Sequence, residues 1–132
     1  DYFLKLASID VGLKRIGIAI CLTSDIVTPH TAILRKNRNQ AARDVNIFLK
    51  EWEIEKLIVG FPSASIDMQN RINHFVSLLE LKIPYEFCEE NMSSIEAEDL
   101  IKGEIKYKRD GRIDSLAAKI ILERYLTKKI LS

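Results

Sequence analysis

The chain has 132 residues, a formal net charge of +1 and 47% hydrophobic residues. This length suits one domain, and the composition supplies enough apolar side chains for a core, which excludes disordered and collagen-like chains. No apolar run reaches the roughly 18 residues that a membrane helix needs, and the N-terminal region lacks the pattern of a secretory signal. We therefore expect a single domain over residues 1–132, a cytoplasmic location and no membrane partner.

The first half of the chain predicts three strands followed by a helix. Residues 3–9 and 15–22 are apolar runs of strand type, and the turn Gly12–Lys14 between them indicates a hairpin. Residues 31–34 form a weaker third strand. From Asn39, a candidate N-cap, apolar residues recur at helical spacing.

The second half alternates strands with helices. Strands are predicted over residues 56–60 and 85–88, and helices around Phe75, over 94–102 and from Ile113 nearly to the C-terminus. A hairpin followed by such alternation is typical of an α/β domain. We expect a mixed five-stranded sheet with helices on both faces.

The cysteines and histidines show no metal-binding spacing. Cys21 and Cys88 end apolar runs without a CxxC pattern, and His30 and His74 are isolated. We expect buried, reduced thiols rather than a disulfide, and no zinc site.

Acidic residues stand in apolar surroundings at the ends of several predicted elements. Asp10 follows the first strand, and Glu89 and Glu90 end the last strand. Asp114 lies in the first turn of the last helix, in line with its apolar stripe. Each has a structural alternative: Asp10 could bind turn amides, the glutamates could face solvent, and Asp114 could interact with the helix dipole.

Taken together, these acids predict a metal site. Strand ends and helix starts converge on one edge of an open sheet, where carboxylates repel one another unless cations are bound. Mg²⁺ and Mn²⁺ prefer oxygen ligands, with water and substrate phosphate completing their coordination. Two such ions about 3.5–4 Å apart stabilise the attacking water and the leaving oxygen of a phosphodiester. The pattern therefore favours hydrolysis of a nucleic-acid backbone.

Two segments are rich in basic residues. Residues 35–43 carry four basic residues and no acid, and residues 102–112 carry five basic residues against two acids. Such segments either contact phosphates or form solvated faces. We expect nucleic-acid contact from Lys106, Lys108 and Arg109.

The spacing of Asp10, Gly12 and Gly17 admits another function. The pattern D-x-G-x-x-x-x-G also occurs in the phosphate-binding hairpin of actin-like ATPases and sugar kinases. Those proteins close two lobes around ATP, and 132 residues leave no room for a second lobe. ATP binding is therefore the weaker alternative.

Four stretches together carry a family resemblance: LASIDVGLKRIGIAI (6–20), LIVGFP (57–62), CEENMSSIEAE (88–98) and IDSLAAKIIL (113–122). In this order and spacing they resemble the YqgF family, known as Holliday-junction-resolvase-like proteins and pre-16S rRNA nucleases. The resemblance implies a ribonuclease H-like fold.

The resemblance also implies site residues. Asp10, Glu90 and Asp114 match the acids that form the family's catalytic, metal-binding site, which would hold Mg²⁺ or Mn²⁺. Lys14 and Arg15 match its basic pair and are expected to meet phosphates.

Four positions are expected to border the site: Gly12, Gly60, Glu89 and Asn91. Glu89 stands where the family has aspartate, and strand alternation allows only one of Glu89 and Glu90 to face the metals. Asn91 stands where the family usually has arginine, and an asparagine cannot form a charged bidentate pair with phosphate. We expect weaker phosphate binding there, or compensation by the basic residues of 102–112.

The sequence thus favours a metal-dependent endonuclease acting on structured RNA, in the 5′-end maturation of pre-16S ribosomal RNA. A Holliday junction resolvase acting on branched DNA is one alternative. A non-catalytic RNA-binding module for ribosome assembly is another. We expect a monomer or a weak homodimer.

Overall fold

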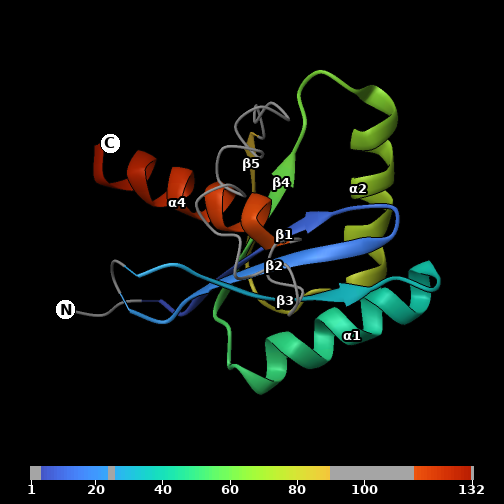
Figure 1. Ribbon diagram of the computed structural model, residues 1–132, viewed down its shortest axis with the longest axis horizontal. Coiled ribbons are helices and arrows are strands. Elements are labelled where there is room, and N and C mark those ends of the chain that lie inside the picture. The colour runs from blue at the N-terminus through green and yellow to red at the C-terminus, as the bar shows by residue number, and fades with distance from the viewer. Residues whose placement is uncertain (1–3, 24–25, 90–114, 132) are drawn as a thin grey trace.

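The computed structural model describes residues 4–23, 26–89 and 115–131 of the chain. Its helices and strands follow the expected alternation (Figure 1). In chain order they are β1 (Leu6–Val11), β2 (Arg15–Cys21), β3 (Thr28–Leu34), α1 (Arg38–Glu51), β4 (Lys56–Phe61), α2 (Ile66–Leu79), β5 (Tyr85–Glu89) and α4 (Leu116–Leu131).

The five strands form one mixed sheet in the order β3-β2-β1-β4-β5. The pairs β1–β2 and β2–β3 are antiparallel, whereas β4 runs parallel to both β1 and β5. Helices α1 and α2 pack on one face, and α4 packs on the other. The predicted mixed five-stranded sheet with helices on both faces is confirmed.

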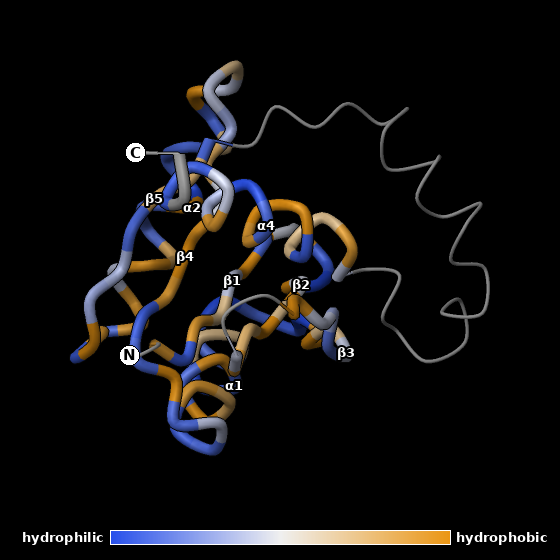
Figure 2. Tube along the Cα trace, turned by 90° about the vertical axis from the view of Figure 1, so that its left-hand side faces the viewer, coloured by the Kyte–Doolittle hydropathy of each residue, from blue (hydrophilic) through white to orange (hydrophobic). Residues whose placement is uncertain are grey.

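Side-chain alternation along β1 separates two environments. Ala7, Ile9 and Val11 pack in the core beneath α1 and α2, while Leu6 packs against α4. Since successive strand residues point to opposite faces, Asp10 shares the α4 face with Leu6. The inner strand β4 is covered on both faces, and Figure 2 shows it as a hydrophobic strand in the middle of the molecule.

Strand β1 covers Leu6–Val11 rather than the predicted residues 3–9. The pairing continues to Asp10 opposite Gly17 and Val11 opposite Ile16. A charged residue ended the apolar run in the sequence, so the prediction stopped too early. Asp10 therefore lies inside a hydrogen-bonded strand, which fixes its backbone more firmly than a turn would.

The predicted N-cap of the first helix, Asn39, is wrong. Asn37 is the N-cap: its side chain accepts a hydrogen bond from the Gln40 amide at 2.8 Å, and the Gln40 side chain accepts one from the Asn37 amide at 3.3 Å. This reciprocal pair is a capping box. It leaves Asn39 in the first turn of α1.

Strand β3 is longer than the predicted 31–34, because Thr28, Pro29 and His30 also pair with β2. Proline lacks an amide hydrogen, but an edge strand tolerates it, and β3 is at the edge of the sheet. The predicted helix over 94–102 lies outside the described residues. Within the described ranges, no helix is both long and apolar enough to span a membrane.

The β1–β2 turn predicts that Gly12→Ala destabilises the protein. The Gly12 amide donates to the Arg15 carbonyl oxygen at 3.0 Å, and a Cβ at Gly12 would lie 2.6 Å from that same oxygen. We expect the free energy of unfolding in urea to fall by about 1–3 kcal/mol. The control Leu13→Ala, at a side chain 61% exposed, should change it by less than about 0.5 kcal/mol. Equal effects of the two substitutions would contradict this account of the turn.

Candidate active site

Asp10 lies in a row of the sheet where both neighbouring strands carry glycine. It pairs with Gly17 of β2. On its other side, Gly60 of β4 follows Val59, which is the register partner of Ile9. Because neither glycine has a side chain, a helix or a ligand can approach the sheet closely beside the half-buried Asp10.

Two buried serines hold α4 against this part of the sheet. The Ser8 hydroxyl donates to the Ala118 carbonyl oxygen at 2.6 Å, and the Ser115 hydroxyl accepts from the Ile18 amide at 3.0 Å. Ser8 and Ser115 are the buried polar side chains among the described residues, and both are 0% exposed. The first turn of α4 is therefore fixed on the Asp10 face.

The Ser115 hydrogen bond falls where the sheet is irregular. The register between β2 and β3 shifts between Ile16 and Ile18, and Gly17, the partner of Asp10, is the residue between them. At this interruption the Ile18 amide is satisfied by Ser115. Ser115 directly follows Asp114 in the sequence. Ser115 therefore contacts β2 at Ile18, the residue after Gly17, which is the register partner of Asp10.

A second contact fixes α4 farther along its length. The Lys56 ammonium donates to the Tyr125 hydroxyl at 2.9 Å and lies 3.0 Å from the Glu86 carboxylate. The hydrogen bonds with Tyr125 and then Glu86 raise the pKa of Lys56, and the bond from Lys56 lowers the pKa of Glu86. This charged cluster joins α4 to β4 and β5.

The register of β5 separates Glu89 from Asp10. Cys88 is buried and its thiol lies 3.7 Å from the Ile121 carbonyl oxygen of α4, so Cys88 faces α4. Glu89 therefore points to the opposite face, as does Phe87, whose ring centroid lies 4.6 Å from that of Phe61 with the two rings tilted. Glu89 thus points away from the Asp10 face, and its place at the border of the site stays a prediction.

The other predicted residues divide into described and undescribed ones. Lys14 and Arg15 are exposed at the β1–β2 turn, close in sequence to Asp10. Among the residues that the structure describes, no three His, Cys, Asp or Glu side chains could hold a metal ion together. The remaining predicted site residues lie outside the described residues: Glu90, Asn91, Lys106, Lys108, Arg109 and Asp114.

Arg35 was not predicted individually, although the basic segment 35–43 includes it. Its guanidinium Nη1 donates to the Gly12 carbonyl oxygen at 2.8 Å, and its amide donates to the Lys14 carbonyl oxygen at 2.9 Å. These two bonds support the turn that follows Asp10.

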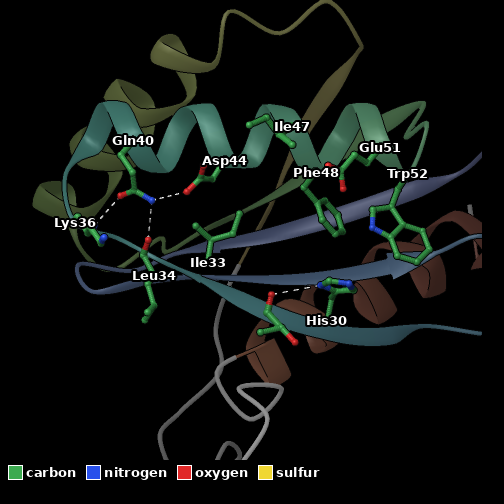
Figure 3. A pocket seen from close by; sticks show the side chains of 11 residues that line it. His30, Ile33, Leu34, Lys36, Gln40, Asp44, Ile47, Phe48, Glu51 and Trp52 are labelled. Carbon is green, nitrogen blue, oxygen red and sulfur yellow. Dashed lines mark hydrogen bonds between the residues drawn. The ribbon is translucent and has the colours of Figure 1, made fainter.

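A groove of about 720 Å³ lies between β3 and α1 (Figure 3). The His30 ring packs edge-on against Phe48 at 5.0 Å and Trp52 at 5.6 Å. Asp44 and Glu51 bring carboxylates to the lining. The groove opens on the α1 side of the sheet, whereas Asp10 faces α4.

Comparison with known proteins decides the family. The family model RuvX, described as Holliday junction resolvase, matches residues 4–128. The chain belongs to the RuvX family. This is the YqgF family that the four sequence stretches resemble, so that prediction is confirmed.

Curated relatives of this RuvX chain are similar over nearly their whole length. The "Putative pre-16S rRNA nuclease" of Sulfurovum sp. (strain NBC37-1) is 63% identical over 127 residues, which cover 94% of this chain and 99% of that protein. The protein of the same name from Sulfurimonas denitrificans is 50% identical over 129 residues, covering 96% of this chain and 99% of the relative.

Solved structures resemble this RuvX chain in fold. The Fowlpox virus Holliday junction resolvase has a TM-score of 0.61 and 16% identity, covering 95% of this chain and 99% of that one. Thermus thermophilus RuvC, solved with a Holliday junction substrate, has a TM-score of 0.57 and 14% identity, covering 90% and 92%. The predicted ribonuclease H-like fold is confirmed.

The contact between α4 and β2 predicts a stability loss for Ser115→Ala. The buried Ile18 amide would lose its acceptor, so we expect the free energy of unfolding in urea to fall by about 1–3 kcal/mol. The control is Ser77→Ala, at an exposed serine whose hydroxyl donates to the His74 carbonyl oxygen within its own helix. It should change the stability by less than about 0.5 kcal/mol. A Ser115→Ala protein as stable as the control would show that this bond does not hold α4.

Proposed function

We propose that this RuvX chain is a divalent-metal-dependent endonuclease that hydrolyses phosphodiester bonds of structured RNA, in the 5′-end maturation of pre-16S ribosomal RNA. The observation that carries the proposal is the position of Asp10. This carboxylate lies on a glycine-flanked part of the sheet, where buried hydrogen bonds fix the start of α4. The names of the curated relatives supply the substrate.

Asp10, Glu90 and Asp114 are the proposed catalytic residues and metal ligands. Alternation in β5 supports Glu90 over Glu89, because Cys88 faces α4 and the next position on that face is two residues later. The contact of Ser115 with Ile18 supports Asp114, its neighbour in sequence. Carboxylate oxygens are the donors that Mg²⁺ and Mn²⁺ prefer, and the glycines beside Asp10 leave room for a hydrated ion.

In this proposal the chain binds and orients the backbone to be cut. Bound divalent ions would stabilise the negative charge that develops on the attacking and leaving oxygens. Lys14 and Arg15, exposed at the turn after β1, would contact phosphates that flank the cut bond. Lys106, Lys108 and Arg109 are proposed to contact phosphates farther away.

Cleavage of branched DNA is the second candidate. The RuvX family model is described as Holliday junction resolvase, and the similar RuvC structure holds a Holliday junction substrate. A resolvase must cut two strands, which requires two active sites related by symmetry. A protein that stays monomeric in light scattering with junction DNA, yet cuts precursor RNA, would favour RNA processing. RNA binding without cleavage by any metal-loaded form would instead favour an assembly module.

The cellular setting is part of the proposal. A pre-rRNA nuclease would act in the cytoplasm, where bacterial ribosome precursors are made. We propose a monomer or a weak homodimer, and static light scattering of the purified protein tests that state.

The proposed site predicts that Asp10→Asn abolishes cleavage. Loss of a metal-binding carboxylate should lower the rate at least about 100-fold, more than the roughly 10–100-fold lost with residues that only support ligands. The assay is cleavage of labelled precursor RNA with Mg²⁺ or Mn²⁺. The control Asp67→Asn removes an exposed acid from the first turn of α2 and should retain wild-type activity. A folded Asp10→Asn protein that cuts as fast as wild type would refute the site.

The register of β5 predicts different effects for its two adjacent glutamates. Glu90→Gln should lower metal-dependent cleavage at least about 100-fold, since it removes a proposed ligand. Glu89→Gln should cut at a rate within about twofold of wild type, because Glu89 lies on the opposite face with Phe87. The rates are compared in the same RNA assay at saturating Mn²⁺. The reverse ranking would show that the other glutamate faces the metals.

A further inference from the structure

A pocket of about 430 Å³ lies at the turn between β1 and β2. Its lining residues come from this turn, the start of α1 and the middle of α2. These elements lie at the right-hand side of Figure 1. We call it the arginine pocket. Its lining residues are Leu13, Arg35, Arg38, Asn70, Arg71 and His74.

Arg35 is held in place within the arginine pocket. Its guanidinium donates to the Gly12 carbonyl oxygen at 2.8 Å and lies over the ring of Phe75 at 5.6 Å. Phe75 is fully buried in the core. The guanidinium is therefore oriented before any ligand arrives, which lowers the entropy cost of binding.

The positive charge of the arginine pocket is not balanced by the described acids. None of Arg35, Arg38 and Arg71 forms an ion pair with a carboxylate of the described residues. Burial, followed by the charges of Arg38 and Arg71, lowers the pKa of Arg35. The charges of Arg38 and Arg71 thus act unfavourably on the Arg35 guanidinium, and a bound anion would relieve that repulsion.

The groove between β3 and α1 has a different charge character. Its lining includes the carboxylates of Asp44 and Glu51 as well as Lys36 (Figure 3), whereas none of the described residues that line the arginine pocket is acidic. Of these two cavities, the arginine pocket is the one suited to an anionic ligand.

The arginine pocket lies close to the proposed active site. Leu13, in its lining, is three positions after Asp10, a distance of at most about 10 Å along an extended backbone. Lys14 and Arg15 are exposed in the same turn. Basic residues therefore continue from the end of β1 round the turn to the α1 and α2 side of the sheet.

We propose that the arginine pocket binds a backbone phosphate of the nucleic-acid substrate, away from the bond that is cut. Guanidinium groups suit this ligand because they form two parallel hydrogen bonds to one phosphate. The inference rests on the proposed function, in that it takes nucleic acid as the substrate. It adds a second contact region on the other side of the turn from the Asp10 carboxylate.

The experiment measures binding separately from cleavage. All proteins carry Asp10→Asn, and fluorescence anisotropy gives their affinity for a labelled RNA spanning the 5′ end of pre-16S rRNA, over a range of salt concentrations. The double variant Arg38→Gln/Arg71→Gln should bind about tenfold more weakly. The slope of log affinity against log salt should become shallower by about 1, as expected for one lost phosphate contact.

Two further variants make the result specific. Lys50→Gln/Lys82→Gln removes the same charge from exposed positions near the other ends of α1 and α2 and should keep affinity within about twofold. Arg38→Lys/Arg71→Lys keeps the charge but not the paired hydrogen bonds, so it should keep the salt slope and lose part of the affinity. Arg35 is left intact because it also supports the turn.

The outcomes separate the pocket from the proposed activity. The phosphate site would be overturned if Arg38→Gln/Arg71→Gln kept the affinity and salt slope of the parent protein. It would also be overturned if Lys50→Gln/Lys82→Gln lost as much affinity, or if the parent protein bound no RNA at all. If the wild-type chain cuts no RNA but Arg38→Gln/Arg71→Gln shows the expected loss of RNA affinity, the nuclease function is refuted and the phosphate site is supported. Thermal unfolding of each variant confirms that it is folded. If Arg38→Gln/Arg71→Gln does not fold, the affinity and salt slope of Arg38→Lys/Arg71→Lys decide whether the pocket binds phosphate.

Discussion

Two buried hydroxyl groups decide how the last helix sits on the first strands. The Ser8–Ala118 and Ile18–Ser115 hydrogen bonds join positions 110 and 97 residues apart in sequence. The surrounding interface is apolar, and apolar contacts alone tolerate small sliding movements. A buried amide or hydroxyl without its partner is costly, so these bonds favour one placement of α4. The proposed chemistry at Asp10 depends on that placement.

The two faces of the sheet differ in the size of their apolar clusters and in the polar groups that they carry. The α1 and α2 face carries the larger apolar core, and most of the folding free energy from apolar burial comes from it. The α4 face carries a smaller cluster together with Ser8, Asp10 and the Lys56–Glu86 pair. Ser8 and Ser115, the buried polar side chains of the described residues, therefore lie where α4 covers the strands. The β1–β2 turn joins the two sides of the sheet next to the proposed site.

Much of the fold could be predicted because local patterns and tertiary packing agree. β4 is a continuous apolar run that is buried on both faces, and α2 presents Ile72, Phe75 and Leu79 at helical spacing to the core. The errors occurred where polar residues have a structural role. Asp10 interrupts an apolar strand without ending it, and Asn37 rather than Asn39 caps α1 because Gln40 returns its hydrogen bond.

The site could be predicted only in part. Asp10 stood out as a charge in an apolar run, but sequence alone gave no reason to prefer Glu89 or Glu90. The register of β5 supports the proposal of Glu90, because it turns Glu89 away from the Asp10 face. Ser8 and Ser115 gave no signal, since a serine within an apolar segment is common and its partners here are distant in sequence. The arginine pocket combines Arg35 and Arg38 with Arg71 of another helix, so only the tertiary structure reveals it.

The alternation along β5 also limits how this segment can change in evolution. Cys88 and Glu89 point to opposite faces, so deleting or inserting one residue between Pro84 and Cys88 would exchange the faces of these two side chains. Exchanging one acidic side chain for another is a milder change than such a shift in length. Homologous chains should therefore vary in residue type along this strand while keeping its length constant.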